Sequence, residues 1–279
     1  MRRLTGILCL MVLVVTLVLL FRSTMPDLSG PVHIPELGPD NPESSEVRRS
    51  LITSFAKNDD DRVSAARKRS LNEVHSLFQK AGLPYPADEL FIRTFKREGE
   101  LEIWARMKTE PFRKIATYGI TADSGGSGPK RREGDQQVPE GFYEVDRFNP
   151  KSNFHLSLGL NYPNASDRIL SDRERPGTDI FIHGNAMSIG CMPLGDDRME
   201  EVYLMALDTK KRPIHIHNFP GRMQGEDWME WRDSQIGSNP TLAAFWDQLQ
   251  PAYDAFEASK RPLKIKVLPD GRYQVQKNP

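Results

Sequence analysis

Hydrophobic and polar positions follow several distinct periods along the chain, and together they predict an α+β fold rich in β-strands. Apolar residues recur at helical spacing from Val63 to Ala81, and Gly82 can end that helix. The turn from Arg97 to Glu100 separates two strand-like runs and predicts a hairpin. Runs typical of strands lie at 90–96, 101–107, 113–120, 141–148, 154–160, 179–183 and 213–219.

Helical spacing returns twice in the second half of the chain. Asp196 or Asp197 can cap a helix over 196–207. A second helix is expected after Pro240, which suits a first turn, and Pro251 is expected to kink or interrupt it. The chain ends in a predicted hairpin, with strands at 263–268 and 272–275.

The N-terminus has the pattern of an anchoring or targeting segment. Arg2 and Arg3 precede a nearly unbroken apolar run from Gly6 to Phe21. The run lacks a small-residue cleavage site, and a bilayer span needs about 17–25 residues. We therefore predict an uncleaved anchor with its N-terminus inside, and a cleaved signal peptide is the close alternative. Five prolines between Pro26 and Pro42 predict an extended spacer after it.

Charge and cysteine content exclude several function classes. The 38 basic and 38 acidic residues balance, so no overall field favours nucleic acid. One of the two cysteines, Cys9, lies in the apolar run, which excludes an intramolecular disulfide framework and a four-cysteine zinc site. The glycine- and lysine-rich segment 124–135 lacks the Gly-Lys-Ser/Thr ending of a phosphate loop, so we expect a mobile basic loop there.

Cys191 is the one cysteine outside the apolar run, and two interpretations of it are open. Most unpaired cysteines are small buried apolar residues. The alternative is a nucleophile whose base is His183, eight positions upstream, because Gly184 allows a sharp turn between them. Gly190 permits a close backbone approach, so amides there could face a developing oxyanion. The second interpretation predicts acyl transfer through a thioester.

These residues resemble the active-site signature of the YkuD-type L,D-transpeptidases, which are cysteine enzymes of bacterial peptidoglycan. His183-Gly184 followed by Ser188-Ile-Gly190-Cys191 carries the resemblance. The chain is most similar to the YafK-like branch, through four further motifs in order: Gly128-Pro-Lys130, Glu133-Gly-Asp135, Pro139 to Tyr143, and Asn161 to Asn164. The resemblance covers roughly 90–222.

The resemblance implies a β-rich catalytic domain with Cys191 as nucleophile, His183 as general base, and the backbone amides of Gly190 and Cys191 as oxyanion hole. The implied donor is a stem peptide that ends in D-alanine after a diamino acid, and no cofactor or metal is implied. An amine acceptor would give a crosslink or an attached protein, whereas water would give hydrolysis. Members of this branch are also linked to the release of an outer-membrane lipoprotein from peptidoglycan.

Two departures from the family pattern leave transpeptidation and hydrolysis unseparated. Ile189 stands where histidine is typical, and Met192-Pro193 follows the cysteine where arginine or asparagine is frequent. A non-catalytic module that binds peptidoglycan is the competing hypothesis.

Several other residues are candidates for a site. Substrate binding is a hypothesis for Ser188, Gly184, His155, Tyr162 and His215, with turn-stabilising or core roles as the alternatives. His215 and His217 share one face of a strand and could form a zinc site with His183 and Cys191, which is the least favoured option. Basic residues 130–132 could attract acidic stem peptides, although a solvated loop is favoured.

The predicted organisation is a membrane anchor or signal segment at 1–24, a Pro-rich linker at 25–58 and a helical lead-in at 59–84. A catalytic domain at 85–225 and a helical and hairpin extension at 226–279 follow. We expect a periplasmic or cell-envelope protein, anchored to the inner membrane, whose partners are peptidoglycan stem peptides and a peptidoglycan-attached lipoprotein.

Overall fold

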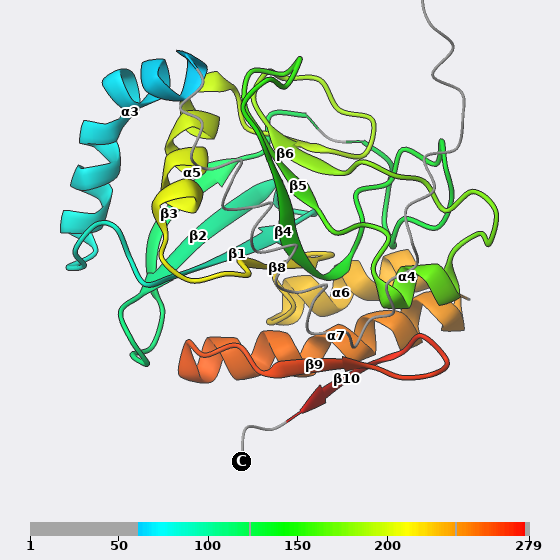
Figure 1. Cartoon of the computed structure of the whole chain (residues 1–279). Helices are drawn as coiled ribbons and strands as arrows, with labels where there is room; N and C mark the ends of the chain where they lie inside the picture. Colours follow the sequence, from blue (N-terminus) through cyan, green and yellow to red (C-terminus); the bar gives the residue numbers. More distant parts are fainter. Residues whose placement is uncertain (1–60, 123, 238, 277–279) are drawn as a thin grey trace, which may run out of the picture. The chain divides into compact units, whose positions relative to one another are not determined.

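A mixed sheet of eight strands forms the centre of the computed structural model (Figure 1). Its strand order is β3-β2-β1-β8-β4-β5-β6-β7. Neighbours are antiparallel except β1 with β8 and β6 with β7, which are parallel. The strands are β1 (Glu89–Phe95), β2 (Glu100–Arg106), β3 (Arg113–Gly119), β4 (Gly141–Asn149), β5 (Ser157–Leu160), β6 (Phe181–His183), β7 (Met192–Pro193) and β8 (His215–Phe219).

The structure describes residues 61–122, 124–237 and 239–276, all within one unit that extends from Glu46 to Pro279. The predicted anchor and Pro-rich linker therefore lie outside the described residues. Among the residues that are described, no helix is both long and apolar enough to span a bilayer.

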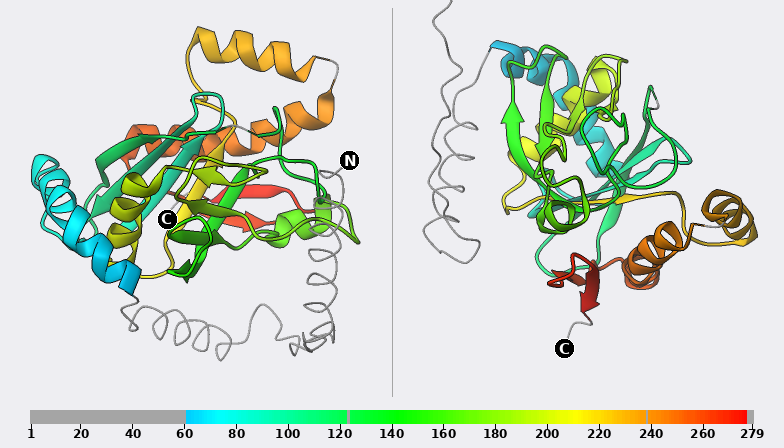
Figure 2. Two further views of the ribbon diagram at one scale, coloured as in Figure 1. Left: turned by 90° about the horizontal axis from the view of Figure 1, so that it is seen from above. Right: turned by 90° about the vertical axis from the view of Figure 1, so that its right-hand side faces the viewer.

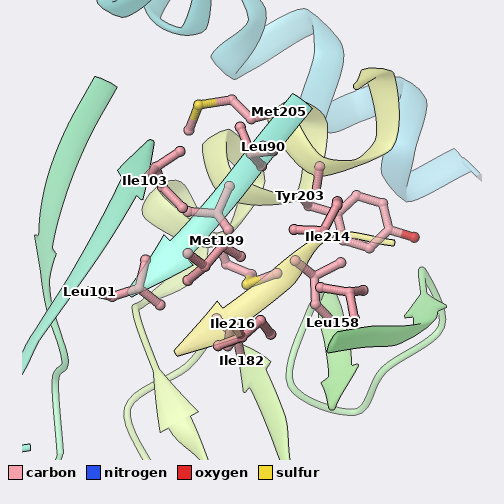
Figure 3. Close-up of a cluster of buried hydrophobic side chains, with 14 of the residues drawn as sticks. Leu90, Leu101, Ile103, Leu158, Ile182, Met199, Tyr203, Met205, Ile214 and Ile216 are labelled. Carbon is pink, nitrogen blue, oxygen red and sulfur yellow. The ribbon is translucent and has the colours of Figure 1, made fainter. Parts of the chain in front are cut away.

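The sheet curls, so that its two edge strands meet. Beyond the end of β3, the amide of Thr121 donates to the carbonyl of Pro193 in β7 at 2.9 Å. The residues on the inner side alternate along each strand with residues on the outer side, as the pleat requires. The inner side holds the main core, which includes Leu90, Leu101, Ile103, Leu158, Ile182, Ile214 and Ile216 (Figure 3).

Two helices, α3 (Asp61–Lys80) and α5 (Asp196–Asp208), cover this core (Figures 1 and 3). Met199, Tyr203 and Met205 of α5 insert among the strand side chains. Arg67 of α3 makes two hydrogen bonds to Asp208 of α5, at 2.7 and 2.6 Å. The helical lead-in predicted from the sequence is thus confirmed as a helix, and it packs on the sheet unit.

The C-terminal helices α6 (Glu226–Ile236) and α7 (Pro240–Ser259) lie on the other side of the sheet from α3 and α5 (Figure 2). Phe95 and Phe219 reach them from the central strands, and Trp246 stacks on Trp231 at 5.7 Å. Pro251 was expected to kink or interrupt this helix, and the structure excludes the interruption, since α7 continues through Pro251. The hairpin β9 (Lys264–Val267) and β10 (Tyr273–Gln276) confirms the last predicted element.

Three short or weakly patterned elements were not predicted. The six-residue helix α4 (Ala165–Leu170) has only a capping box as its signal, made by Asn164 and Asp167. The two residues of β7 are too few to show a period. Helix α6 buries only Trp228, so it lacks an apolar stripe. The strand expected over 154–160 begins only at Ser157.

Candidate active site

The parallel pairing of β6 with β7 places Cys191 and His183 on one face of the sheet. Ile182 pairs with Met192 and His183 with Pro193, so Cys191, just before β7, stands beside Phe181. Side chains alternate along a strand, and therefore the thiol and the imidazole point to the same side. Strands about 4.8 Å apart with a rise of about 3.3 Å per residue put their Cα atoms roughly 8 Å apart. The two side chains can meet across that diagonal.

His183 is held in one tautomer by the backbone. Its side chain is buried, and Nδ1 donates to the carbonyl of Gly184 at 2.5 Å. A carbonyl can only accept a hydrogen bond, so Nδ1 carries the proton and Nε2 keeps its lone pair. Burial lowers the pKa of His183, opposed by the Gly184 hydrogen bond. The neutral imidazole that a general base requires is thereby favoured.

Phe154 covers the imidazole. Its ring lies 4.8 Å from the ring of His183 at an angle of 35°, and the side chain is 41% exposed. One side of the phenyl ring therefore shields the base while the other side faces solvent. Exclusion of water from a basic side chain disfavours its charged form, which is the direction of the His183 shift.

The thiol of Cys191 is partly buried and is directed to a backbone carbonyl. Sγ donates to the carbonyl of Asp179 at 3.8 Å. Burial raises the pKa of the thiol, and a hydrogen bond from the backbone of Phe181 opposes that rise. The resting pair is thus a neutral thiol and a neutral imidazole. Proton transfer to His183 requires rotation of the thiol away from Asp179.

Two glycines of the loop 184–191, which leads to Cys191, have little room for a side chain. A Cβ on Gly184 would lie 2.5 Å from Oδ1 of Asp196 and 2.9 Å from the carbonyl oxygen of Phe154. Gly190 has φ +123°, and a Cβ there would lie 3.0 Å from the carbonyl of Gln137. Both glycines therefore set the path of the backbone around Cys191.

Ser188 stabilises the turn before the nucleophile. Its hydroxyl donates to the carbonyl of Cys191 at 2.7 Å and accepts from the amide of Gly190 at 3.2 Å. Ser124 Oγ lies 3.0 Å from the same hydroxyl. This is the local role that the sequence left open. The amide of Gly190 must leave Ser188 before it can face an oxyanion, so its place in an oxyanion hole stays a prediction.

His155 and Tyr162 are engaged in contacts within the fold. Nε2 of His155 is 2.7 Å from Oε1 of the buried Glu200, which also accepts from Ser70 at 2.8 Å. Tyr162 is buried and donates to the carbonyl of Pro176 at 2.8 Å. Substrate binding by His155 or Tyr162 stays a prediction.

His215 and His217 lie on β8, three strands away from β6 in the sheet order, and the structure does not bring them to Cys191. Nδ1 of His215 is 3.4 Å from Glu144 at the surface. His217 is buried between the rings of Phe91 and Phe142, and burial holds its pKa well below the ordinary value. Within the described ranges, no three His, Cys, Asp or Glu side chains are grouped to hold a metal ion.

The basic loop at 124–135 is tied down, contrary to the expectation of a mobile solvated loop. Lys130 is only 4% exposed and donates to Asp135 at 2.6 Å and to the carbonyl of Arg132 at 2.9 Å. The Asp135 carboxylate also accepts from the amides of Arg131, Arg132 and Gln137. Burial raises the pKa of Cys191, and the charge of Lys130 opposes that rise.

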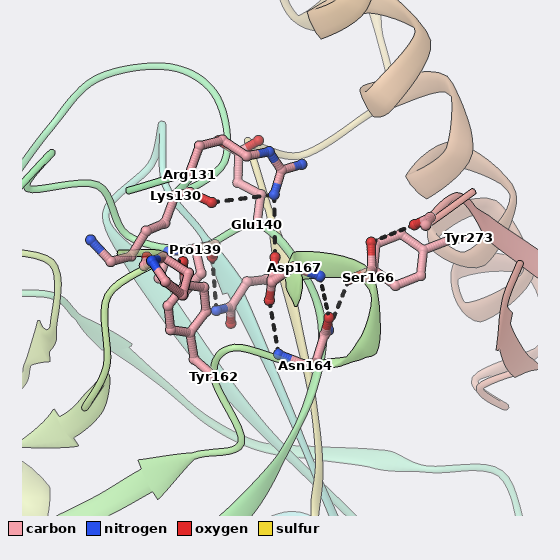
Figure 4. Close-up of polar contacts among 12 residues, drawn as sticks. Lys130, Arg131, Pro139, Glu140, Tyr162, Asn164, Ser166, Asp167 and Tyr273 are labelled. Carbon is pink, nitrogen blue, oxygen red and sulfur yellow. Dashed lines mark hydrogen bonds and ion pairs between the residues drawn. The ribbon is translucent and has the colours of Figure 1, made fainter. Parts of the chain in front are cut away.

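The family-like motifs meet around a buried carboxylate (Figure 4). Asp167 accepts from Arg131 at 3.2 Å, from Tyr143 at 3.0 Å and from the amide of Asn164 at 3.2 Å. Burial raises the pKa of Asp167 to about 6. Tyr143 and Asn164, which come from two of the motifs, therefore meet at Asp167 together with Arg131, which lies between two others.

Sequence reasoning missed Phe154, Asp179 and the carbonyl of Gly184. Phe154 lies outside the family-like motifs, and its role depends on a loop conformation that no period reveals. The contributions of Asp179 and Gly184 are made by backbone oxygens, which every residue type possesses. The one sequence signal for these contacts was the His183-Gly184 pair, which places a backbone carbonyl next to the imidazole.

Comparison with known proteins identifies the family. The family described as YkuD, L,D-transpeptidase catalytic domain, matches residues 100–216. "Putative L,D-transpeptidase YafK" of Escherichia coli K12 is 33% identical over 193 residues, which cover 67% of this chain and 74% of that protein. The same protein of Escherichia coli O157:H7 gives the same values.

Solved structures show weaker likenesses. The helical cell shape determining protein Pgp2 of Campylobacter jejuni gives a TM-score of 0.41 at 18% identity, over 69% of this chain and 79% of Pgp2. Bd1075 of Bdellovibrio bacteriovorus gives 0.37 at 20% identity, over 69% and 78%.

Proposed function

This chain belongs to the YkuD family of L,D-transpeptidases, and we propose that it is a peptidoglycan-acting enzyme that forms a thioester at Cys191. The donor is the carbonyl of a diamino acid in a stem peptide, and the acyl group passes to an amine or to water. The observation that carries the proposal is the shared face of Cys191 and His183 on adjoining parallel strands, with Nε2 left free by the Gly184 bond.

The proposed reaction begins with transfer of the Cys191 proton to Nε2 of His183. The thiolate attacks the donor carbonyl, and a tetrahedral intermediate forms whose oxyanion is held by the amides of Gly190 and Cys191. The C–N bond then breaks, and the leaving amine of the terminal D-amino acid takes the proton from His183. An incoming amine or water attacks the thioester, gives its proton to His183 and releases the thiol.

A muropeptide assay tests the proposal. Full-length protein is incubated with a defined disaccharide tetrapeptide, and the products are identified by mass spectrometry. The expected results are a thioester adduct at Cys191 and loss of the terminal D-amino acid, both absent in Cys191→Ser. Turnover by Cys191→Ser at the wild-type rate would overturn the thioester mechanism.

Alkylation of the thiol tests the competing hypothesis of a non-catalytic module. Near neutral pH, iodoacetamide should label Cys191 faster in the wild-type protein than in His183→Ala, because the imidazole generates the thiolate. Equal rates in both proteins, with no turnover of any muropeptide, would favour a module that only binds peptidoglycan.

The acceptor is identified by the product. New muropeptide dimers indicate transpeptidation, whereas release of the D-amino acid alone indicates hydrolysis. Release of a lipoprotein-derived peptide from a conjugate indicates the hydrolase of the YafK-like branch. The substrate class supports a cell-envelope location, and the membrane anchor at 1–24 is part of the proposal.

A further inference from the structure

A cavity of about 340 Å³ opens next to Cys191, on the side of the sheet where several strands begin or end. The directions of the strands show that β1, β3 and β8 end on this side and that β4, β6 and β7 begin there. Cys191 immediately precedes β7 on the same side. The cavity is lined by the strand ends Thr94, Lys96, Ile120, Val138, Glu140 and Met192, and by the loop 124–127 and parts of α6.

The cavity wall is joined directly to the nucleophile turn. Met192, the neighbour of Cys191, is part of the lining. On the opposite side, Ser124 of the lining is 3.0 Å from Ser188, which donates to the carbonyl of Cys191. A peptide that occupied the cavity would therefore extend past the turn that carries the thiol.

Among the residues that the structure describes, one cation of the lining has no acidic partner. Lys96 and Glu140 neutralise each other at 3.0 Å, and Lys96 also donates to the carbonyls of Gly128 and Val138. The remaining charged lining residue is Arg97, which is exposed. Its guanidinium lies 5.4 Å over the ring of Trp231 and donates once, to the carbonyl of Asp227. Its other N–H groups can bind a carboxylate.

The other wall offers neutral donors and apolar surface. Gly125 and Gly126 belong to the lining, and so does Ser127, whose hydroxyl donates to Oε1 of Gln235 at 2.5 Å. For the amides of Gly125 and Gly126, the part of the chain that the structure describes provides no acceptor. Trp231 and Ile120 supply apolar surface for a small side chain.

We propose that this cavity is a subsite that binds the terminal carboxylate of a stem peptide between Arg97 and the 124–127 loop. The inference rests on the proposed function for its choice of peptide. It adds a recognition site contributed by the turn after β1 and by α6, neither of which carries the reactive pair. Arg97 and Trp231 would thus select peptides by charge and size before acylation.

A pair of substitutions at Gly126 tests the charge. A Cβ there meets nothing closer than Nε2 of Gln137 at 4.0 Å, so a side chain is tolerated. Gly126→Asp and Gly126→Asn have nearly equal bulk and differ by one negative charge. Both are made in full-length Cys191→Ala, in which no acylation occurs. Calorimetry then measures binding of a stem tetrapeptide and of the same peptide with its terminal carboxylate amidated.

Gly126→Asp is expected to weaken binding of the peptide with a free terminal carboxylate (the acid) by about 5- to 30-fold relative to Gly126→Asn, because it adds one like charge at short range in a partly solvated site. Binding of the amidated peptide (the amide) should change less than twofold. Arg97→Gln should weaken the acid by about 10-fold and spare the amide, and Met229→Ala, on α6 but outside the lining, should affect neither.

The outcomes separate this subsite from the function on which it rests. Equal binding of acid and amide in every variant, or equal losses for both, would overturn carboxylate recognition in the cavity while leaving the enzyme proposal intact. Failure of both peptides to bind the Cys191→Ala parent would overturn the proposed function together with the subsite.

Discussion

Gly184→Ala is expected to destabilise the protein markedly, because the added methyl group has no space. Its Cβ would start 2.5 Å from Oδ1 of Asp196 and 2.9 Å from the carbonyl oxygen of Phe154. Ordinary contact begins at 3.4 Å, so the carboxylate must retreat by about 0.9 Å. That carboxylate accepts from the amide of Asn185 at 2.8 Å, and the retreat breaks the hydrogen bond.

The magnitude follows from these two effects. Overpacking in a filled region costs about 1–3 kcal/mol, and loss of one hydrogen bond to a charged group about 1.5 kcal/mol. We expect a loss of about 2–4 kcal/mol in the free energy of unfolding. For a domain of this size that corresponds to a fall in Tm of about 5–15 °C.

Urea denaturation followed by circular dichroism measures the change, with Gly119→Ala as the matched control. Gly119 lies in β3, and a Cβ there has nothing within 4 Å, so its alanine variant should stay within about 0.5 kcal/mol of wild type. An unfolding free energy of Gly184→Ala within 0.5 kcal/mol of the control would refute the steric argument.

Three further predictions concern groups around the nucleophile loop. Phe154→Ala should let water reach His183 and raise the pKa of His183 toward 6.5, which moves the acid limb of the kcat/KM profile to higher pH. Phe154→Leu should shift that limb less. An acid limb that does not move in Phe154→Ala contradicts the shielding role. Asp135→Asn should lower the free energy of unfolding by about 3 kcal/mol in urea titrations, because Lys130 is left buried and unpaired. Adding Lys130→Met should recover part of that loss. If the double variant recovers nothing, the unpaired lysine is not the cause. Asp167 has a folded pKa near 6, above its unfolded value of 3.8, so the native state binds its proton more tightly. Its contribution to stability is greatest below about pH 4 and declines by up to about 3 kcal/mol as pH rises through 6. Asp167→Asn should remove that decline from the difference between urea titrations at pH 4 and pH 7.

Periodic elements were predictable because burial on one face leaves a repeat in the sequence. The helix α3, the hairpin of β1 and β2, and the helix α5 all follow from such repeats. These repeats did not reveal which strands pair with one another. The parallel pairing of β1 with β8 joins residues more than a hundred positions apart, and no local pattern encodes it.

Residue type and spacing suggested Cys191 and His183 as the reactive pair, and this assignment is part of the proposed function. Their surroundings could not be inferred in the same way. Ser188 was equally compatible with substrate and turn, and only the folded loop directs its hydroxyl to the carbonyl of Cys191. Lys130 looked like a solvated charge, yet the loop folds back and buries it against Asp135.

The sequence by itself determined the α+β class, the family, and one cysteine with one histidine of the right chemistry, because these depend on composition, order and period. Tertiary structure alone decided that both side chains share a face, that a backbone carbonyl fixes the tautomer of His183, and that a cavity adjoins Cys191. Met192 of β7 and Trp231 of α6 line one cavity, and Phe154 packs on His183 of β6, although these residues lie far apart in the sequence. Contacts of that kind depend on three-dimensional packing, which a one-dimensional pattern does not specify.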